Sequence, residues 1–372
     1  MQVYNKEKRG KEMRLRKITY ALFIIATICL FTSCKKECKH QSIEWVIDKQ
    51  ATCTEEGIEH EECTKCHEKF DIKEIKKLKH ICNDEGICTI CGNKVATSGL
   101  IYKLNEDKKS YYVSEYIGID IDIIIPAKYD GLYVTSIGDS AFSNFIGLTS
   151  IEIPNSVTSI KYGAFSGCIG LTSIEIPSSV TIVDYCAFDD CDNISYNIYD
   201  NGKYLGNTEN PYLVIVGVTN NTTESFSINP NTKLIGGGVF SKCRNLKSIE
   251  IPDGVTSIGV SAFNWCGSLK SIKIPDSVTS IGNSVFSGCT SLKSIEIPNS
   301  VTSIGDSAFR GCINLTSIII PNSVTSMGDE VFNMCKAITV YCEALEKPSG
   351  WSEWWNYSNY GNCYVVWGYK KN

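Results

Sequence analysis

The residues best suited to metal or redox chemistry are concentrated near the start of the chain. Residues 38–95 contain all four histidines, together with many of the 19 cysteines. Two C-x-x-C pairs are present there, Cys63 with Cys66 and Cys88 with Cys91, and such a turn presents two thiolates to one tetrahedral metal ion. These four cysteines are therefore the candidate ligands of a structural zinc ion.

Two other interpretations of this segment stay open. Small exported domains with little core commonly form disulfides, although the odd number of cysteines here leaves one outside such a scheme. The string from Cys63 to His67 also spells C-x-x-C-H, the haem-attachment sequence, but one short match in a cysteine-rich segment has little specificity. As a zinc site or as a disulfide framework, the module is expected to stabilise a segment with few large apolar residues.

The rest of the chain is poor in groups for catalysis. No histidine follows His80, so a histidine-assisted nucleophile is not expected in residues 81–372. Glutamates of the later segments leave a surface polysaccharide hydrolase as a less favoured alternative, because glycosidases use paired carboxylates. The net charge is −5, and we expect no basic stripe in the later residues, which argues against nucleic acid as a partner.

The elements that position these residues follow from a repeat of 23 residues. Its clearest copy, Leu292 to Phe309, reads LKSIEIPNSVTSIGDSAF. Proline, phenylalanine and cysteine recur in phase, the cysteines being Cys168, Cys191, Cys266, Cys289, Cys312 and Cys335. A fixed period of this length with aliphatic residues in phase predicts a leucine-rich-repeat solenoid. We expect the cysteines to be small buried apolar groups rather than metal ligands.

Each copy is predicted to form one coil. In its S-I-E segment, alternation turns Ile151 inward and Glu152 outward, and the proline that follows ends the strand. The D-S-A-F segment is predicted to be a one-turn helix with a polar N-cap. Coils must stack to bury their apolar faces, and each adds about 4.8 Å. The expected fold class is therefore α+β: a β-rich, right-handed solenoid with a parallel sheet, preceded by the small Cys/His-rich module.

The repeats resemble those of BspA-like leucine-rich-repeat proteins, which are bacterial surface proteins. The resemblance is carried by I-x-I-P-x-x-V-T-S-I-G-x-x-A-F-x-x-C units between Ile123 and Cys335, and by the endings PSGW at Pro348–Trp351 and VVWGY at Val365–Tyr369. It implies a surface-exposed binding or adhesion protein without catalytic residues. The partners it implies are host extracellular-matrix or cell-surface proteins, or glycans.

The first residues predict export and lipid anchoring. From Met13, a basic end precedes an apolar run from Tyr20 to Phe31, which is too short to span a membrane, and small residues precede Cys34. Residues 1–33 are therefore predicted to be a signal peptide with its true start at Met13. The string F-T-S-C resembles a bacterial lipobox, which makes Cys34 the lipid-attachment site of an outer-membrane lipoprotein. An ordinary signal peptide, cut elsewhere, is the alternative.

The remaining segments are expected to anchor, close or interrupt the solenoid. Phe188 and Phe240 are 52 residues apart rather than 46, and N-G and N-P turn signals predict an irregular, hairpin-like coil around 197–229. Cys342 and Cys363 bracket an aromatic segment and are a candidate disulfide. The predicted order is a lipid-anchored N-terminus (34–37), the Cys/His-rich module (38–95), N-terminal cap strands (96–125), repeats (126–341) and an aromatic C-terminal cap (342–372).

Outward strand positions on the concave face form the predicted binding surface. They are Glu152, Glu175, Glu250, Lys273, Glu296 and Ile319. Lys273 between two glutamates is expected to form a cross-strand charge ladder, worth about 0.2–1 kcal/mol per pair. The sequence thus favours a lipid-anchored surface protein that binds proteins or glycans in adhesion. A structural role in envelope assembly, by packing against like neighbours, is the alternative.

Overall fold

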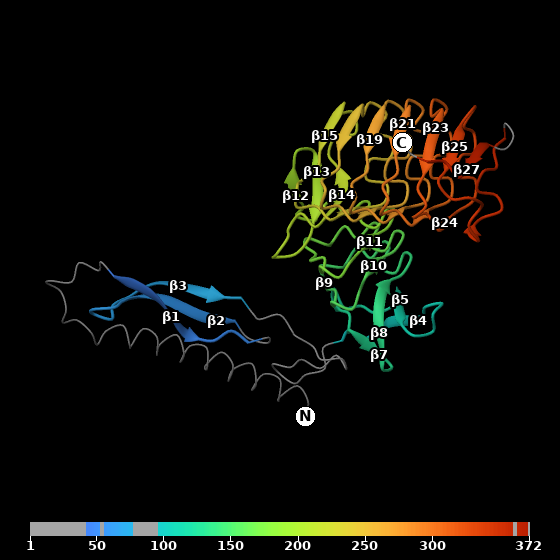
Figure 1. Cartoon of the computed structure of the whole chain (residues 1–372). Helices are drawn as coiled ribbons and strands as arrows, with labels where there is room; N and C mark the ends of the chain where they lie inside the picture. The colour runs from blue at the N-terminus through green and yellow to red at the C-terminus, as the bar shows by residue number, and fades with distance from the viewer. Residues whose placement is uncertain (1–41, 53–55, 77–95, 360–362, 371–372) are drawn as a thin grey trace. The chain divides into compact units, whose positions relative to one another are not determined.

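The computed structural model describes residues 42–52, 56–76, 96–359 and 363–370, which fall into two units (Figure 1). The first unit ends at Ile81 and the second begins at Cys82. The predicted signal peptide, Cys34, and the predicted zinc ligands Cys88 and Cys91 lie outside the described residues. Within the described part of the chain, no helix has the length and apolar character needed to cross a membrane.

The first unit is a three-stranded antiparallel sheet. Its strands are β1 (Ile43–Lys49), β2 (Gly57–Cys63) and β3 (Lys69–Ile75), and β2 is the central one. β1 is almost fully exposed, whereas β2 carries the buried His60 and the buried Cys63. The sheet is therefore held by main-chain pairing around a small polar centre rather than by a large apolar core.

The second unit begins with strands that lie against the first coil. β4 (Leu100–Leu104) and β5 (Tyr111–Tyr116) form an antiparallel hairpin, and β5 pairs in parallel with β8 (Leu132–Ile137). β6 (Asp122–Ile124) pairs in parallel with β9 (Ser150–Glu152), and β7 (Lys128–Tyr129) folds back on β8. The hairpin thus covers the edge strand β8, while β6 starts the series of S-I-E strands.

Each regular coil contributes two short strands, where the sequence predicts one. The S-I-E segments form β17 (Ser248–Glu250), β19 (Ser271–Lys273), β21 (Ser294–Glu296) and β23 (Ser317–Ile320). The T-S-I segments form β10 (Ser159–Ile160), β11 (Ile182–Val183), β16 (Leu234–Ile235), β18 (Ser257–Ile258), β20 (Ser280–Ile281), β22 (Ser303–Ile304) and β24 (Ser326–Met327). The T-S-I strands from β16 to β24 pair in parallel from coil to coil, and the S-I-E strands pair in parallel as β19 with β21, because stacking by 23 residues aligns the backbone on both sides of a coil.

The solenoid core is a stack of in-phase side chains. Phe240, Phe263, Phe286, Phe309 and Phe332 are fully buried, and consecutive ring centroids are 5.1 to 5.7 Å apart. The cysteines lie beside them, and each thiol of the regular coils donates to the carbonyl of the phenylalanine one coil earlier, as Cys289 does to Phe263 at 3.2 Å. The prediction that these cysteines belong to the core is confirmed.

The predicted one-turn helix is wrong, and with it the α+β class, since no helix occurs in the described residues. The segment at Asp306–Phe309 shows why. Ser307 and Gly311 have positive φ values of 55° and 71°, which interrupt a right-handed helix. The N–H groups of Ser307, Phe309 and Gly311 also donate to carbonyls of the next coil, at 2.8 to 2.9 Å. The main-chain donors of this turn therefore bond to the next coil instead of forming helical hydrogen bonds within the turn.

The stretch 197–229 replaces part of one coil by an antiparallel meander. β12 (Asn197–Tyr199), β13 (Gly202–Leu205) and β14 (Val214–Val218) pair in that order, and β14 then pairs in parallel with β16. β15 (Ser225–Ser227) completes the coil by pairing with β17. This coil therefore keeps both strand positions, but residues 216–224 stand where other coils have A-F-x-x-C.

The last coils end in tryptophans. β25 (Thr339–Cys342) pairs with β27 (Tyr364–Trp367), and β26 (Gly350–Trp351) extends the T-S-I strands. The Trp355 ring meets Phe332 edge-on, with centroids 6.2 Å apart, and so covers the end of the phenylalanine stack. The candidate disulfide between Cys342 and Cys363 is wrong, because both thiols are free and the strand register places Cys342 opposite Trp367.

Candidate binding surface

The outward side chains of the S-I-E strands form a continuous surface, here called the SIE face. Every second residue of β17, β19 and β21 is exposed, while the isoleucine between them is buried. In Figure 1 these strands lie side by side with β15, β23, β25 and β27. The outward residues make two rows. One contains Ser225, Ser248, Ser271, Ser294, Ser317, Thr339 and Tyr364; the other contains Ser227, Glu250, Lys273, Glu296, Ile319, Tyr341 and Val366.

Four of the six predicted binding residues meet in the second row. Lys273 lies directly opposite Glu296 in the strand register, and Glu250 stands one strand earlier. Ile319 follows on β23 and is half-buried. These four residues therefore lie in one row of the SIE face, and their role in binding stays a prediction.

The other two predicted residues lie beyond the irregular coil. Glu152 is half-buried on β9, and Glu175 is exposed in a segment without strand pairing. After that segment, Ile176 donates its N–H to the carbonyl of Gly206, in the irregular coil, rather than to a regular coil. Glu152 and Glu175 are thus separated from the row that begins at Glu250.

A row of lysines borders the SIE face and was missed by sequence reasoning. Lys247, Lys270 and Lys293 are exposed, and each N–H of the later two donates to the carbonyl of the lysine one coil before. Lys247 also forms an ion pair with Glu224 at 2.7 Å. This row corrects the expectation that the repeats carry no basic stripe. The 23-residue period was the available signal, since it brings together lysines that are far apart in the sequence.

The C-terminal end of the SIE face is apolar and aromatic. Ile319, Tyr341 and Val366 align across β23, β25 and β27, and Tyr364 beside them is 71% exposed. The Tyr341 ring packs against Tyr369, with centroids 4.8 Å apart. The sequence predicts that Tyr364 and Tyr369 belong to the cap, and the structure adds that the cap strands continue the two rows of the SIE face.

The N-terminal sheet holds a polar network around the buried His60. Its ring contacts Asp48 Oδ2 at 2.6 Å through Nδ1 and Glu62 Oε2 at 3.1 Å through Nε2. Glu62 also accepts from the exposed His67, and Asp48 from Lys69 at 2.9 Å. Partial burial works in the opposite direction, but hydrogen bonds from Lys69 and His60 lower the pKa of the Asp48 carboxyl. Both histidines are thus engaged by carboxylates.

Two of the four predicted metal ligands, Cys63 and Cys66, lie among the described residues of this unit. Cys63 is buried at the end of β2, and Cys66 is half-buried in the following turn. Among the side chains that the structure describes, no group of three or more His, Cys, Asp or Glu is placed to hold a metal ion. The zinc site of Cys63, Cys66, Cys88 and Cys91 stays a prediction, because two of its four ligands lie outside the described residues.

The thiols of the solenoid are unsuited to nucleophilic chemistry. Burial raises the pKa of Cys168 and Cys335 to about 12 and holds the pKa of Cys289 and Cys312 well above the usual value. The thiolate is the reactive form of cysteine, and these groups stay protonated at neutral pH. The cysteines that follow the repeat period therefore serve packing.

Comparison with known proteins gives one matching family model and a group of similar solved structures. The family model for the BspA type leucine-rich-repeat region matches residues 132–208 and 219–339, in six copies. A crystal structure of a T. pallidum leucine-rich-repeat protein, TpLRR, is 26% identical, covering 59% of this chain and 90% of that chain with a TM-score of 0.32.

Two further solved structures are similar in sequence. A leucine-rich cell surface protein from Faecalibacterium prausnitzii A2-165 is 25% identical, over 70% of this chain and 96% of that chain, with a TM-score of 0.38. A leucine-rich-repeat protein from Bacteroides ovatus ATCC 8483 is 24% identical, over 74% and 77%, with a TM-score of 0.33. The comparison with curated proteins gave no match. Because the family model spans more than half of the residues, in phase with the stacked coils, the chain belongs to the BspA-type leucine-rich-repeat family.

Proposed function

We propose that this chain is a bacterial cell-surface protein that binds another protein through the SIE face. The main support for the proposal is that the face is continuous. Its serine and charged residues are followed, on the C-terminal strands, by apolar and aromatic residues. Such a surface is long and open, whereas small-molecule sites are clefts or cavities that bury most of the ligand. Aromatic residues with one polar end are also enriched where proteins bind each other.

The charges of the face suggest what the partner carries. Lys247, Lys270 and Lys293 are stacked at the spacing of adjacent strands, about 4.8 Å, where like charges repel. A partner that places carboxylates over this row relieves the repulsion, and its apolar groups then meet Ile319 and Tyr341. We therefore propose a partner with an acidic segment next to an apolar one, such as a host extracellular-matrix or cell-surface protein.

The location belongs to the same proposal. One similar solved structure is described as a cell surface protein. The sequence before the described residues has the layout of a signal peptide ending at a lipobox-like cysteine. We propose that Cys34 is lipidated and holds the protein on the outer membrane, and loss of the protein from the membrane fraction on Cys34→Ser tests this.

The binding proposal is tested with the purified chain against an array of immobilised matrix and bacterial surface proteins. Lys273→Glu reverses a charge at the centre of the SIE face, and Lys233→Glu is the matched control, exposed outside the S-I-E strands. We expect at least about tenfold weaker binding for Lys273→Glu, wild-type binding for Lys233→Glu, and weaker binding of the wild type at high salt. Equal loss in both variants, or concentration-dependent self-association as the only interaction, refutes the proposal.

A further inference from the structure

One junction between coils lacks the main-chain bonds that join all the regular ones. At the junction before it, Gly163, Phe165 and Gly167 donate to the carbonyls of Tyr185, Ala187 and Asp189 at 2.8 to 3.0 Å. Gly238, Phe240 and Lys242 likewise donate to the next coil at 2.7 to 2.9 Å. The equivalent donors at the junction between these two coils are Cys186, Phe188 and Asp190, and the structure gives their N–H groups no main-chain acceptor among the described residues.

The irregular coil is the cause of this gap. Residues 216–224 run in place of the A-F-x-x-C turn that would fill the layer, because β14 pairs with β13 up to Val218. The same loss is seen in the core, where Cys266 donates to Phe240 at 3.1 Å but no hydrogen bond of the Cys243 thiol is found within the described part of the chain. One turn of the solenoid is thus missing.

The two flanking coils close only part of the gap. At Gly237 they touch, since a Cβ placed there would lie 2.4 Å from the Tyr185 nitrogen. The Gly237 N–H also donates to Val183 at 2.9 Å. The Tyr185 side chain extends this contact, since its ring lies against Gly238 and its hydroxyl hydrogen-bonds with Ser241, and a pocket of about 350 Å³ remains beside it. The triple glycine at 236–238 is the sequence signal for this approach.

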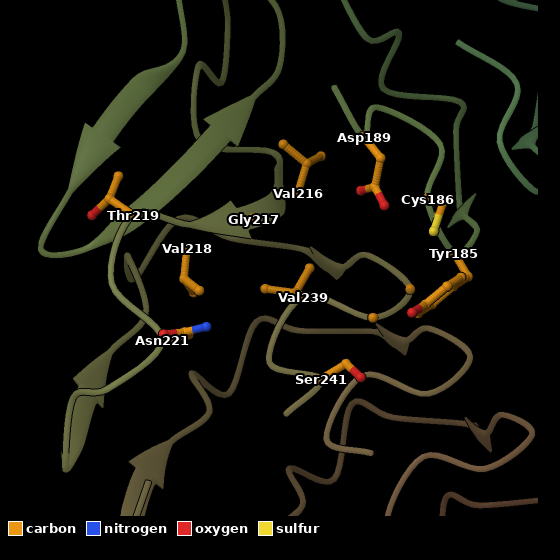
Figure 2. Close-up of a pocket in the computed structure, with 12 residues that line it drawn as sticks. Tyr185, Cys186, Asp189, Val216, Gly217, Val218, Thr219, Asn221, Val239 and Ser241 are labelled. Carbon is orange, nitrogen blue, oxygen red and sulfur yellow. The ribbon is translucent and has the colours of Figure 1, made fainter. Parts of the chain in front are cut away.

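Figure 2 shows how the pocket is walled. Cys186 and Asp189 lie on the coil before the gap, and Val239 and Ser241 lie on the coil after it. Val216, Val218, Thr219 and Asn221 of the irregular coil line the third side, and Tyr185 closes the opposite end. The Tyr185 ring is itself stacked against Tyr162, with centroids 6.2 Å apart, and Tyr162 is 52% exposed.

The chemistry of these walls selects a ligand class. On one wall the Cys186 N–H has no main-chain acceptor among the described residues, and on the other no described main-chain N–H donates to the carbonyls of Gly237, Val239 and Ser241. The ligand therefore needs groups that both accept and donate, as hydroxyls do. The lining is mostly polar, and the valines add only a small apolar area. Asp189 lines the pocket without any lysine or arginine among the described lining residues, which disfavours anions. The volume lies at the lower end of the range for small-molecule sites.

We propose that this pocket binds one neutral sugar ring, free or at the end of a glycan. A pyranose presents hydroxyls around its rim, which match the polar walls, and C–H groups on its faces, which can meet the Tyr185 ring at one end of the pocket. The site is separate from the SIE face and goes beyond the proposed function, because it would take a carbohydrate while the face takes a protein. Loss of one activity therefore leaves the other measurable.

The test uses the full chain and a blocking variant with a matched control. Ser241 follows Phe240, and the equivalent residue after Phe309 is Arg310, so the fold accepts an arginine at this position of a coil. Ser241→Arg places a long side chain in the pocket. Ser287→Arg makes the same change after Phe286, in a regular coil, outside the pocket lining. Asp189→Asn is the second variant, which keeps the shape and removes the charge.

Binding is measured by calorimetry and by saturation-transfer NMR against neutral monosaccharides, neutral oligosaccharides and acidic sugars. We expect at least one neutral sugar to bind, at least about tenfold weaker binding for Ser241→Arg, and no change for Ser287→Arg. Weaker binding of Asp189→Asn would add that the carboxylate accepts from a hydroxyl. The proposal is overturned if no neutral sugar binds, if acidic sugars bind better, or if both arginine variants bind equally. Protein binding by the SIE face is expected to survive Ser241→Arg.

Discussion

Replacing Phe286 by alanine tests whether the stacked rings hold the solenoid together. Phe286 is fully buried, and its ring lies between Phe263 at 5.6 Å and Phe309 at 5.5 Å. Removing a buried phenylalanine costs about 3–5 kcal/mol of unfolding free energy, through lost burial and the cavity left behind. Two stacked neighbours add about 0.5–1.5 kcal/mol each beyond burial, so we expect Phe286→Ala to fall at the upper end of that range.

Phe188→Ala is the control variant for this prediction. Phe188 stacks on Phe165 at 5.4 Å, but the coil after it has no turn and offers no stacked ring. Its removal should therefore cost about 1 kcal/mol less than the removal of Phe286. Urea unfolding of the full chain, followed by the fluorescence of its tryptophans and by far-ultraviolet circular dichroism, gives both free energies. A cost for Phe188→Ala equal to or above that for Phe286→Ala would refute the role assigned to the stack.

Two further predictions concern the backbone and the thiols. Gly237→Ala should destabilise the chain by about 1–3 kcal/mol, because the added Cβ would lie 2.4 Å from the main-chain nitrogen of Tyr185. Gly217→Ala is the control and should be nearly neutral, because its Cβ would have no neighbour closer than 3.8 Å. Thermal and urea unfolding measure both variants, and equal effects would contradict the close approach at Gly237. Stability should fall as pH rises from about 9 towards 12, because unfolded thiols ionise near 9 while burial raises the pKa of Cys168, Cys335 and Cys342 in the fold to about 12. Unfolding curves at pH 8, 9.5 and 10.5 check this, and stability that does not change over that range would contradict the burial of the thiols.

The sequence was sufficient for the parts of the fold that repeat. Phase alone identified the buried phenylalanines and cysteines, because every coil gives Phe263 and Cys266 the same surroundings as their equivalents. It was not sufficient for the turn at Asp306–Phe309. Helix capping is a local rule, but the N–H groups of Ser307 and Phe309 are taken by the next coil, and that competition is visible only in the stack.

The candidate sites could also be predicted only in part. Glu250, Lys273 and Glu296 were predictable, since alternation in a strand decides which side chains point outward. Continuation of their row into Tyr341 and Val366 was not, because the last coils depart from the 23-residue spacing. The pocket was also missed. It depends on residues that are missing from a coil, and its one local sign is the triple glycine at 236–238.

The absent turn between Cys186 and Ser241 also decides how the molecule would respond to mechanical load. The apolar interior is divided into two blocks, one containing Phe165 and Phe188 and the other Phe240 to Phe332. At all regular joints between coils, rows of main-chain bonds share a pulling force, but here several of those rows are missing. A stack stretched between its ends would part first at this seam, and each half would keep its own interior intact.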